Sequence, residues 1–178
     1  MKKILIVILF CFSITYISAQ PANLDWYVGT WKYENTSTGE ELIIKLKKSQ
    51  EVVPPTFGGG IEECLVGVYR YKKNNLILAD KLDLFNENLV PFGCPGTISI
   101  GRDISHLMLC IKDYTITNGR GKYKTISIPS TVVYNTSSPK TIKWKLVVEE
   151  QEYFYYEQID RFPEGTNLPI EIVLTKVE

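Results

Sequence analysis

The stretch VGTWKYENTSTGEELIIKLKK (residues 28–48) predicts the fold class, because its apolar residues alternate with polar ones on both sides of a turn. Trp31 and Tyr33 share one face of the first half, and residues 41–48 alternate in the same way. This period of two is typical of strands that bury one face. Residues 35–39 between the halves are rich in turn-forming side chains. The stretch therefore predicts a β-hairpin.

The same period continues along most of the chain, and Asn74-Asn75 marks a second tight hairpin because asparagine tolerates positive φ. Further strands are predicted at 64–73, 76–80, 97–100, 104–112, 123–128, 131–134, 141–149 and 170–176. No stretch offers a convincing amphipathic helix. We therefore predict one all-β domain, residues 20–178, built as an antiparallel up-and-down barrel of about eight strands, with a sandwich as the alternative, since an open sheet would expose its edges.

Residues 1–19 combine a basic start, Lys2-Lys3, with a short apolar run and a small residue, Ala19, before a plausible cleavage point. This pattern is typical of a secretory signal peptide. The alternative is a membrane anchor, for which the uncharged stretch of residues 4–20 is short and diluted by hydroxyl side chains. We therefore expect export to the periplasm or the extracellular space.

Removal of residues 1–19 leaves 18 basic and 20 acidic side chains, and three cysteines. Export makes a disulfide possible, and Cys64 with Cys94 is the pairing we favour, because Cys94-Pro95-Gly96 is a loop that a strand could anchor. The alternative is that Cys64, Cys94 and Cys110 are all reduced, with Cys110 buried as a small apolar residue.

The charge balance and the side-chain inventory exclude several functions. Equal numbers of basic and acidic residues in the whole chain argue against a nucleic-acid partner. The single histidine, His106, lies four strand residues from Cys110, and a separation of about 13 Å is too long for a nucleophile–base pair or a shared metal. We therefore expect no catalytic residues, no metal and no cofactor.

Gly29-Thr30-Trp31 resembles the G-x-W signature of lipocalins and related barrels. That resemblance implies that Trp31 closes one end of a barrel beneath a basic side chain late in the chain, for which Lys176 and Arg161 are both candidates. A second resemblance covers about two thirds of the mature chain. Residues 28–33, 40–44, 65–71, 141–144 and 168–176 are similar to a bacterial family of small exported domains of unknown function, which implies no particular activity.

The remaining lead is the aromatic content, which is 18 of the 159 residues from Gln20 onward. Aromatic side chains on strands either fill a small barrel or line a cavity for an apolar ligand. The residues concerned are Trp31, Tyr33, Tyr69, Tyr71 and Trp144. We therefore expect a non-enzymatic lipocalin-like protein, with a small hydrophobic ligand as its candidate partner. The alternative is a structural or protein-interaction domain that uses exposed aromatics such as Tyr153–Tyr156.

Overall fold

The protein is described by a computed structural model over residues 23–53, 59–89, 98–102, 107–117, 121–126, 131–135, 140–146 and 165–177. Ten strands and two short 3₁₀ helices cover most of these residues. In chain order they are η1 (Leu24–Trp26), β1 (Gly29–Asn35), β2 (Glu40–Val53), β3 (Gly60–Lys73), β4 (Leu76–Asp80), η3 (Leu82–Asn86), β5 (Ile98–Arg102), β6 (Leu107–Thr117), β7 (Tyr123–Ile126), β8 (Thr131–Asn135), β9 (Thr141–Lys145) and β10 (Glu171–Lys176). The prediction of an all-β, antiparallel fold is confirmed.

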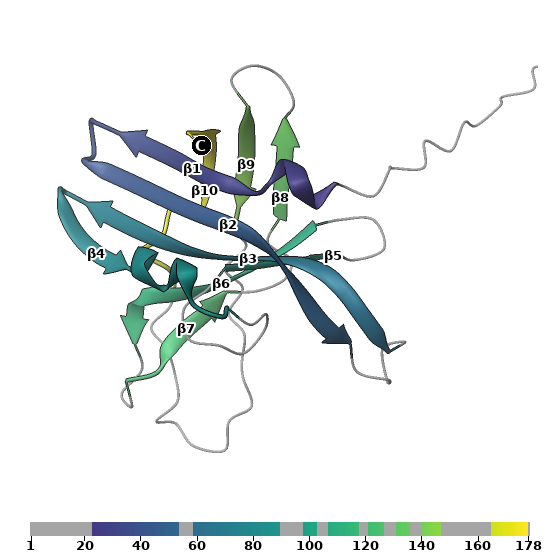
Figure 1. The fold of residues 1–178 in the computed structure, drawn as a ribbon. Helices are drawn as coiled ribbons and strands as arrows, with labels where there is room; N and C mark the ends of the chain where they lie inside the picture. Colours follow the sequence, from purple (N-terminus) through teal and green to yellow (C-terminus); the bar gives the residue numbers. More distant parts are fainter. Residues whose placement is uncertain are drawn as a thin grey trace, which may run out of the picture.

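All ten strands join one sheet in the order β2-β1-β10-β9-β8-β6-β5-β3-β4, while β7 pairs with β6 and β2 also pairs with β3. The β2–β3 pairing is the longest, from Glu41 opposite Lys72 to Val53 opposite Gly60. Figure 1 shows this hairpin extending past the other strands, with β8 and β9 lying beside each other on another part of the sheet. The β6–β8 pairing is the shortest, a single pair of Met108 and Thr131.

The predicted turn at Asn74 and Asn75 is confirmed. Both residues have positive φ, 51° and 61°, as a tight hairpin requires. The Asn75 N–H also donates to the Gly39 carbonyl at 3.2 Å. The tips of the β1–β2 and β3–β4 hairpins are therefore joined to each other.

The middle of β3, residues 64–69, is buried on both faces, which explains the apolar run there. Leu65, Tyr69 and Tyr71 enter the main core, to which every other strand also contributes, β4 through Ala79 and β7 through Ile126. On the opposite face, a smaller cluster packs under η3. Its members are Cys64, Val66, Val68 and Leu89, with Leu82, Leu84 and Phe85 against them.

A lysine fixes η3 on the outside of the sheet. The Lys47 ammonium donates to the carbonyls of Phe85 and Glu87 at 2.6 and 2.9 Å, and it lies 5.2 Å from the centre of the Phe85 ring. These contacts satisfy carbonyls at the end of the 3₁₀ helix. The outer face of β2 and β3 is therefore covered here, which alternation alone does not predict.

Candidate functional site

The five aromatic residues predicted to line a ligand site all contact one core. Trp31, Tyr69 and Tyr71 are 0% exposed and Trp144 is 1% exposed. Tyr33 is half-buried and packs against the same core. Four of the five are thus almost completely enclosed by protein, while Tyr33 keeps part of its side chain exposed.

The polar atoms of the four buried residues are bonded within the protein. The Trp31 and Trp144 indoles donate to the carbonyls of Tyr27 and Pro169, at 2.8 and 3.2 Å. The Tyr71 hydroxyl donates to Glu40 Oε1 at 3.0 Å, and the Tyr69 hydroxyl donates to the Lys112 carbonyl at 2.9 Å. In a ligand site, some buried polar atoms usually lack a protein partner and bond to the ligand instead. The bonding of all four side chains therefore favours a role in filling the core.

One end of the interior is closed around Trp31. Leu24 of η1 and Tyr27 are 1% and 3% exposed, and Figure 1 shows η1 beside the start of β1. The Lys176 ammonium lies 5.4 Å from the centre of the Trp31 ring and donates to the Val28 carbonyl at 2.7 Å. Of the two basic residues considered, Lys176 therefore packs on Trp31, while Arg161 lies outside the described residues. We call this the Trp31 end.

The strand directions show which residues lie at the opposite end of the sheet. Strands β3 and β6 both pair antiparallel with β5, so they run in the same direction. The last residues of β6 therefore lie at the same end of the sheet as Tyr71, near the end of β3. There the pairing of β6 with β7 shifts register between Asp113 and Thr117. Such bulges redirect side chains and are common beside functional sites.

Three tyrosines meet at this end, which we call the tyrosine end. The Tyr114 ring centre lies 4.6 Å from that of Tyr123 and 6.1 Å from that of Tyr69. Two ammonium groups lie over the Tyr114 ring, Lys81 at 4.8 Å and Lys112 at 5.7 Å from its centre. The cluster thus combines aromatic surface with positive charge.

At this end the Tyr69 hydroxyl bonds two backbone groups of β6. It donates to the Lys112 carbonyl and accepts from the Tyr114 N–H at 2.8 Å. Among the described residues, the pairing of β5 with β6 ends at Ile98 and Ile111, and these two backbone groups lie just past that pair. The hydroxyl therefore gives both groups a hydrogen-bond partner.

Burial keeps these phenols protonated. Burial, with a smaller contribution from the neighbouring Tyr123, raises the pKa of Tyr114 to about 12. Burial is also the main cause that raises the pKa of Tyr69 and of Tyr71; for Tyr71 the hydrogen bond to Glu40 adds to it. All three are therefore neutral hydroxyl groups at physiological pH.

The free energy of unfolding is expected to fall as the pH rises above 10. Tyrosines of the unfolded chain lose their protons near 10.0, whereas Tyr114 keeps its proton to about 12 and Tyr69 and Tyr71 keep theirs beyond their ordinary value. The stabilisation is therefore complete below pH 10 and is lost as the pH rises through the folded values. Urea unfolding across this range, with tyrosinate absorbance recorded in parallel, measures it, and a constant stability would contradict the burial of these phenols.

A segment ahead of β10 is tied to the tyrosine end by a buried carboxylate. Asp113 is 0% exposed, and its oxygens accept from the Thr115 N–H at 2.8 Å and from the Thr166 hydroxyl at 2.6 Å. The Thr166 hydroxyl accepts in turn from the Leu168 N–H at 3.0 Å, and Leu168 is 2% exposed. The Lys124 ammonium donates to the Gly165 carbonyl at 2.7 Å. Residues 165–168 are therefore fixed against β6 and β7.

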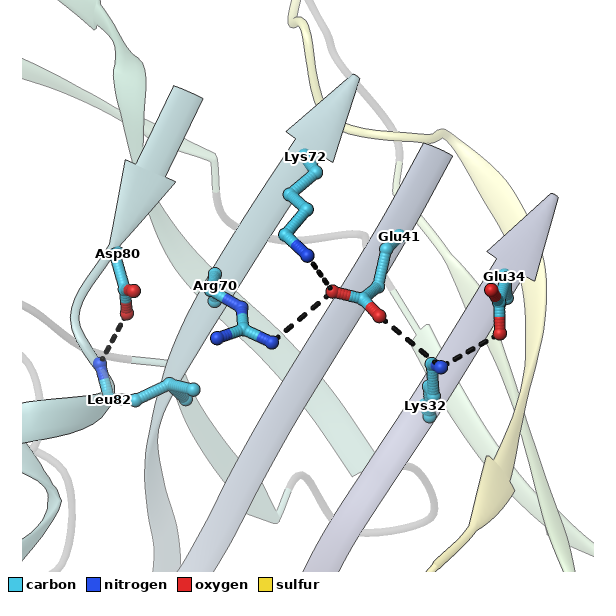
Figure 2. Close-up of polar contacts among 7 residues, drawn as sticks. All are labelled: Lys32, Glu34, Glu41, Arg70, Lys72, Asp80 and Leu82. Atoms are coloured by element: carbon cyan, nitrogen blue, oxygen red, sulfur yellow. Dashed lines mark hydrogen bonds and ion pairs between the residues drawn. The ribbon is translucent and has the colours of Figure 1, made fainter. Parts of the chain in front are cut away.

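The outer face of β1, β2 and β3 carries an ion-pair network centred on Glu41 (Figure 2). Its carboxylate lies 3.0 Å from Lys72 Nζ and 3.2 Å from both Lys32 Nζ and an Arg70 nitrogen. Burial would raise the pKa of Glu41, but hydrogen bonds from Lys72 and Lys32 outweigh it and the pKa is lowered. Lys32 also pairs with Glu34 at 2.7 Å. The network joins three strands and sets three basic groups against two carboxylates.

A shallow groove of about 450 Å³ lies beside this network, where β1 and β10 share only the pairs of Trp31 with Lys176 and Lys32 with Thr175. Its lining residues are Lys32, Tyr33, Glu34, Val173, Thr175 and Val177. Of the predicted lining residues, Tyr33 therefore lies in this groove.

Several predicted features lie outside the described residues, among them Cys94, His106 and Tyr153–Tyr156. Cys64 is buried on β3 and Cys110 is half-buried on β6. Because Cys94 lies outside the described residues, its pairing with Cys64 stays a prediction. Across the described ranges, no group of three His, Cys, Asp or Glu residues is arranged to hold a metal ion.

Sequence reasoning missed Tyr114, Asp113 and Lys81 as members of one cluster. The available signal was alternation on β6, which puts Asp113 on the inward face with Leu109 and Ile111. An inward carboxylate between apolar residues is uncommon and needs partners. The contacts of Lys81 join β6 to the end of β4, a long-range pairing that no local pattern records.

Comparison with known proteins identifies the family. The chain matches, over residues 1–177, a protein family described as a family of unknown function (DUF6705), and it belongs to that family. No curated protein and no solved structure matches the chain. Within the described residues, none of the helices has the length and apolar character needed to cross a membrane.

Proposed function

We propose that this chain is an exported, non-enzymatic protein with a lipocalin-like barrel, and that it binds a small apolar ligand at the tyrosine end. The observation that carries the proposal is the contrast between the two ends. Trp31, Leu24 and Tyr27 are almost completely buried at one end, with the Trp31 indole bonded. At the other end the Tyr114 hydroxyl is buried and has no hydrogen-bond partner in the part of the chain that the structure describes.

The strand order supports the barrel. The pairing of β2 with β3 links the two ends of a path that otherwise runs from β2 through β1, β10, β9, β8, β6 and β5 to β3. Eight antiparallel strands in that order have room for a side-chain core or one small ligand. The packing of Lys176 over Trp31 also agrees with the G-x-W resemblance.

Export is supported by the sequence of residues 1–19, with Lys2-Lys3 ahead of an apolar run. A role without catalysis is supported by the single histidine of the chain and by the bonded state of Asp113, whose partners are hydroxyl and amide donors.

A titration with N-phenyl-1-naphthylamine, an uncharged apolar fluorophore, tests the proposal. The protein is expected to bind one molecule per chain. Tyr123→Leu, at the tyrosine end, is expected to weaken binding about tenfold, since it removes an aromatic wall. Trp26→Leu is the matched control, because Trp26 is 45% exposed and stacks on Tyr134 at the Trp31 end. A chain that does not bind the probe, or that loses binding only in Trp26→Leu, would overturn the proposed site.

A protein-interaction domain is the second candidate, and the groove between β1 and β10 favours it. Val173 and Val177 in this groove are each 53% exposed, and Val133 on the outer face of β8 is 59% exposed. Val133 and Val173 both pair with Lys143 of β9, so they lie in one row. Self-association in a light-scattering concentration series, together with no binding of the fluorophore, would favour this candidate.

A further inference from the structure

The buried Tyr114 hydroxyl is an exception to the hydrogen bonding of the interior. Tyr114 is 9% exposed, and among the described residues its hydroxyl oxygen has no hydrogen-bond partner. The hydroxyl groups of Tyr69 and Tyr71, which are also buried, are both bonded. An unsatisfied buried hydroxyl is costly, and proteins keep one mainly where a water, an ion or a ligand completes it.

The surroundings of Tyr114 indicate what kind of atom would complete it. A protonated phenol donates one hydrogen bond, and the raised pKa of Tyr114 keeps that proton in place. Lys81 and Lys112 put two positive charges over its ring, at 4.8 and 5.7 Å from the centre. The one buried carboxylate nearby, Asp113, is engaged by Thr115 and Thr166. A donor beside two ammonium groups favours an acceptor that carries negative charge.

A ligand would reach the Tyr114 hydroxyl past the side chain of Tyr123. Its ring packs on that of Tyr114 at 4.6 Å but is only half-buried. It belongs to β7, a four-residue strand that, among the described strands, pairs with β6 alone. Because β7 lies off the path of paired strands, Tyr123 can move away from Tyr114 without breaking that path.

We propose that Tyr114 anchors the ligand by donating a hydrogen bond to an anionic head group, so that the ligand is an amphiphile with an apolar body and a charged acceptor. The head group lies between the Tyr114 hydroxyl and the ammonium groups of Lys81 and Lys112, and the apolar body packs against the rings of the tyrosine end. This inference rests on the proposed function, because it assigns a ligand class to the same site.

Two fluorophores that differ in the head group test the inference. 1-Anilinonaphthalene-8-sulfonate has the apolar body and a sulfonate, and N-phenyl-1-naphthylamine has the same body without it. Tyr114→Phe is expected to weaken binding of the sulfonate probe about tenfold and to leave the uncharged probe unchanged, because only one charge-assisted hydrogen bond is lost. Lys81→Gln is expected to weaken binding of the sulfonate probe about threefold and to leave binding of the uncharged probe unchanged. Tyr134→Phe, at the Trp31 end, is the control and should change neither affinity.

The outcomes separate this inference from the function on which it rests. Equal affinity of the sulfonate probe for the unchanged protein and for Tyr114→Phe would overturn the anchor, as expected if a water molecule completes the hydroxyl, while binding of the uncharged probe would still support the proposed function. Failure of the unchanged protein to bind either probe would overturn both. Competition of the two probes for one site per chain excludes nonspecific adsorption of the sulfonate.

Discussion

Replacing Tyr69 by phenylalanine is expected to lower the free energy of unfolding by about 3 kcal/mol, because it leaves two buried backbone groups without a partner. The Tyr69 hydroxyl donates to the Lys112 carbonyl and accepts from the Tyr114 N–H. Phenylalanine keeps the ring and its packing in the core, where Tyr69 is 0% exposed. The loss of stability therefore reports the contribution of the hydroxyl alone. Urea unfolding followed by tryptophan fluorescence measures this loss.

The matched control is Tyr114→Phe in the absence of ligand. The Tyr114 ring centre lies 6.1 Å from that of Tyr69, but its hydroxyl is buried without a partner among the residues the structure describes. Removing an unsatisfied group is expected to leave stability unchanged or to raise it by about 1 kcal/mol. Equal losses in the two variants would mean that the Tyr69 hydroxyl does not bond β6.

Replacing Gly67 by alanine is expected to cost about 3 kcal/mol, the upper part of the range for overpacking. A Cβ at this position would meet the Lys45 carbonyl oxygen and the Leu46 Cδ2 atom, the latter at 2.6 Å. The backbone oxygen cannot rotate away, so β2 and β3 have to separate. Gly67 lies opposite Leu46 within the longest strand pairing of the sheet. Thermal and urea unfolding both measure the effect.

Gly121→Ala separates steric crowding from backbone strain. Gly121 has a φ of 73° and open space around it, so alanine there costs only the strain of a left-handed conformation, about 1 kcal/mol. Gly67 has no such φ, and its cost comes from contact alone. A Gly67→Ala variant no less stable than Gly121→Ala would show that β2 and β3 do not approach this closely.

The strands were predictable because each buries one face, and the clearest case is the hairpin of residues 28–48. Alternation there assigned Trp31, Leu42 and Ile44 to the core, and all three are almost fully buried. The turn at Asn74-Asn75 was predictable for a different reason, since few residues accept positive φ. Both signals are local in sequence.

The features that could not be predicted depend on contacts between distant segments. Leu82, Leu84 and Phe85 form η3 because Val66 and Val68 offer a second apolar face on β3. A run that is apolar on both faces has no period to indicate which partner covers which side. For the same reason, the prediction from sequence could not assign the five aromatics to core or to cavity.

The candidate site was predictable only in part. Aromatic residues on strands indicated where a ligand could contact the protein, and Tyr33 does line a groove. The tyrosine end depends instead on Tyr114, Tyr123 and Lys81, which meet through the bulge in β6 and the end of β4. A register shift of this kind changes which side chains face inward, and strict alternation does not foresee it.

The central claim is that the exported chain carries one small molecule at the tyrosine end, and native mass spectrometry of the protein purified from its own host tests it most directly. We expect a chain that lacks residues 1–19 and carries one added small-molecule mass per chain, which is lost in Tyr123→Leu and retained in Trp26→Leu. A spectrum of the bare mature chain, unchanged when the two naphthalene probes are added, would contradict it.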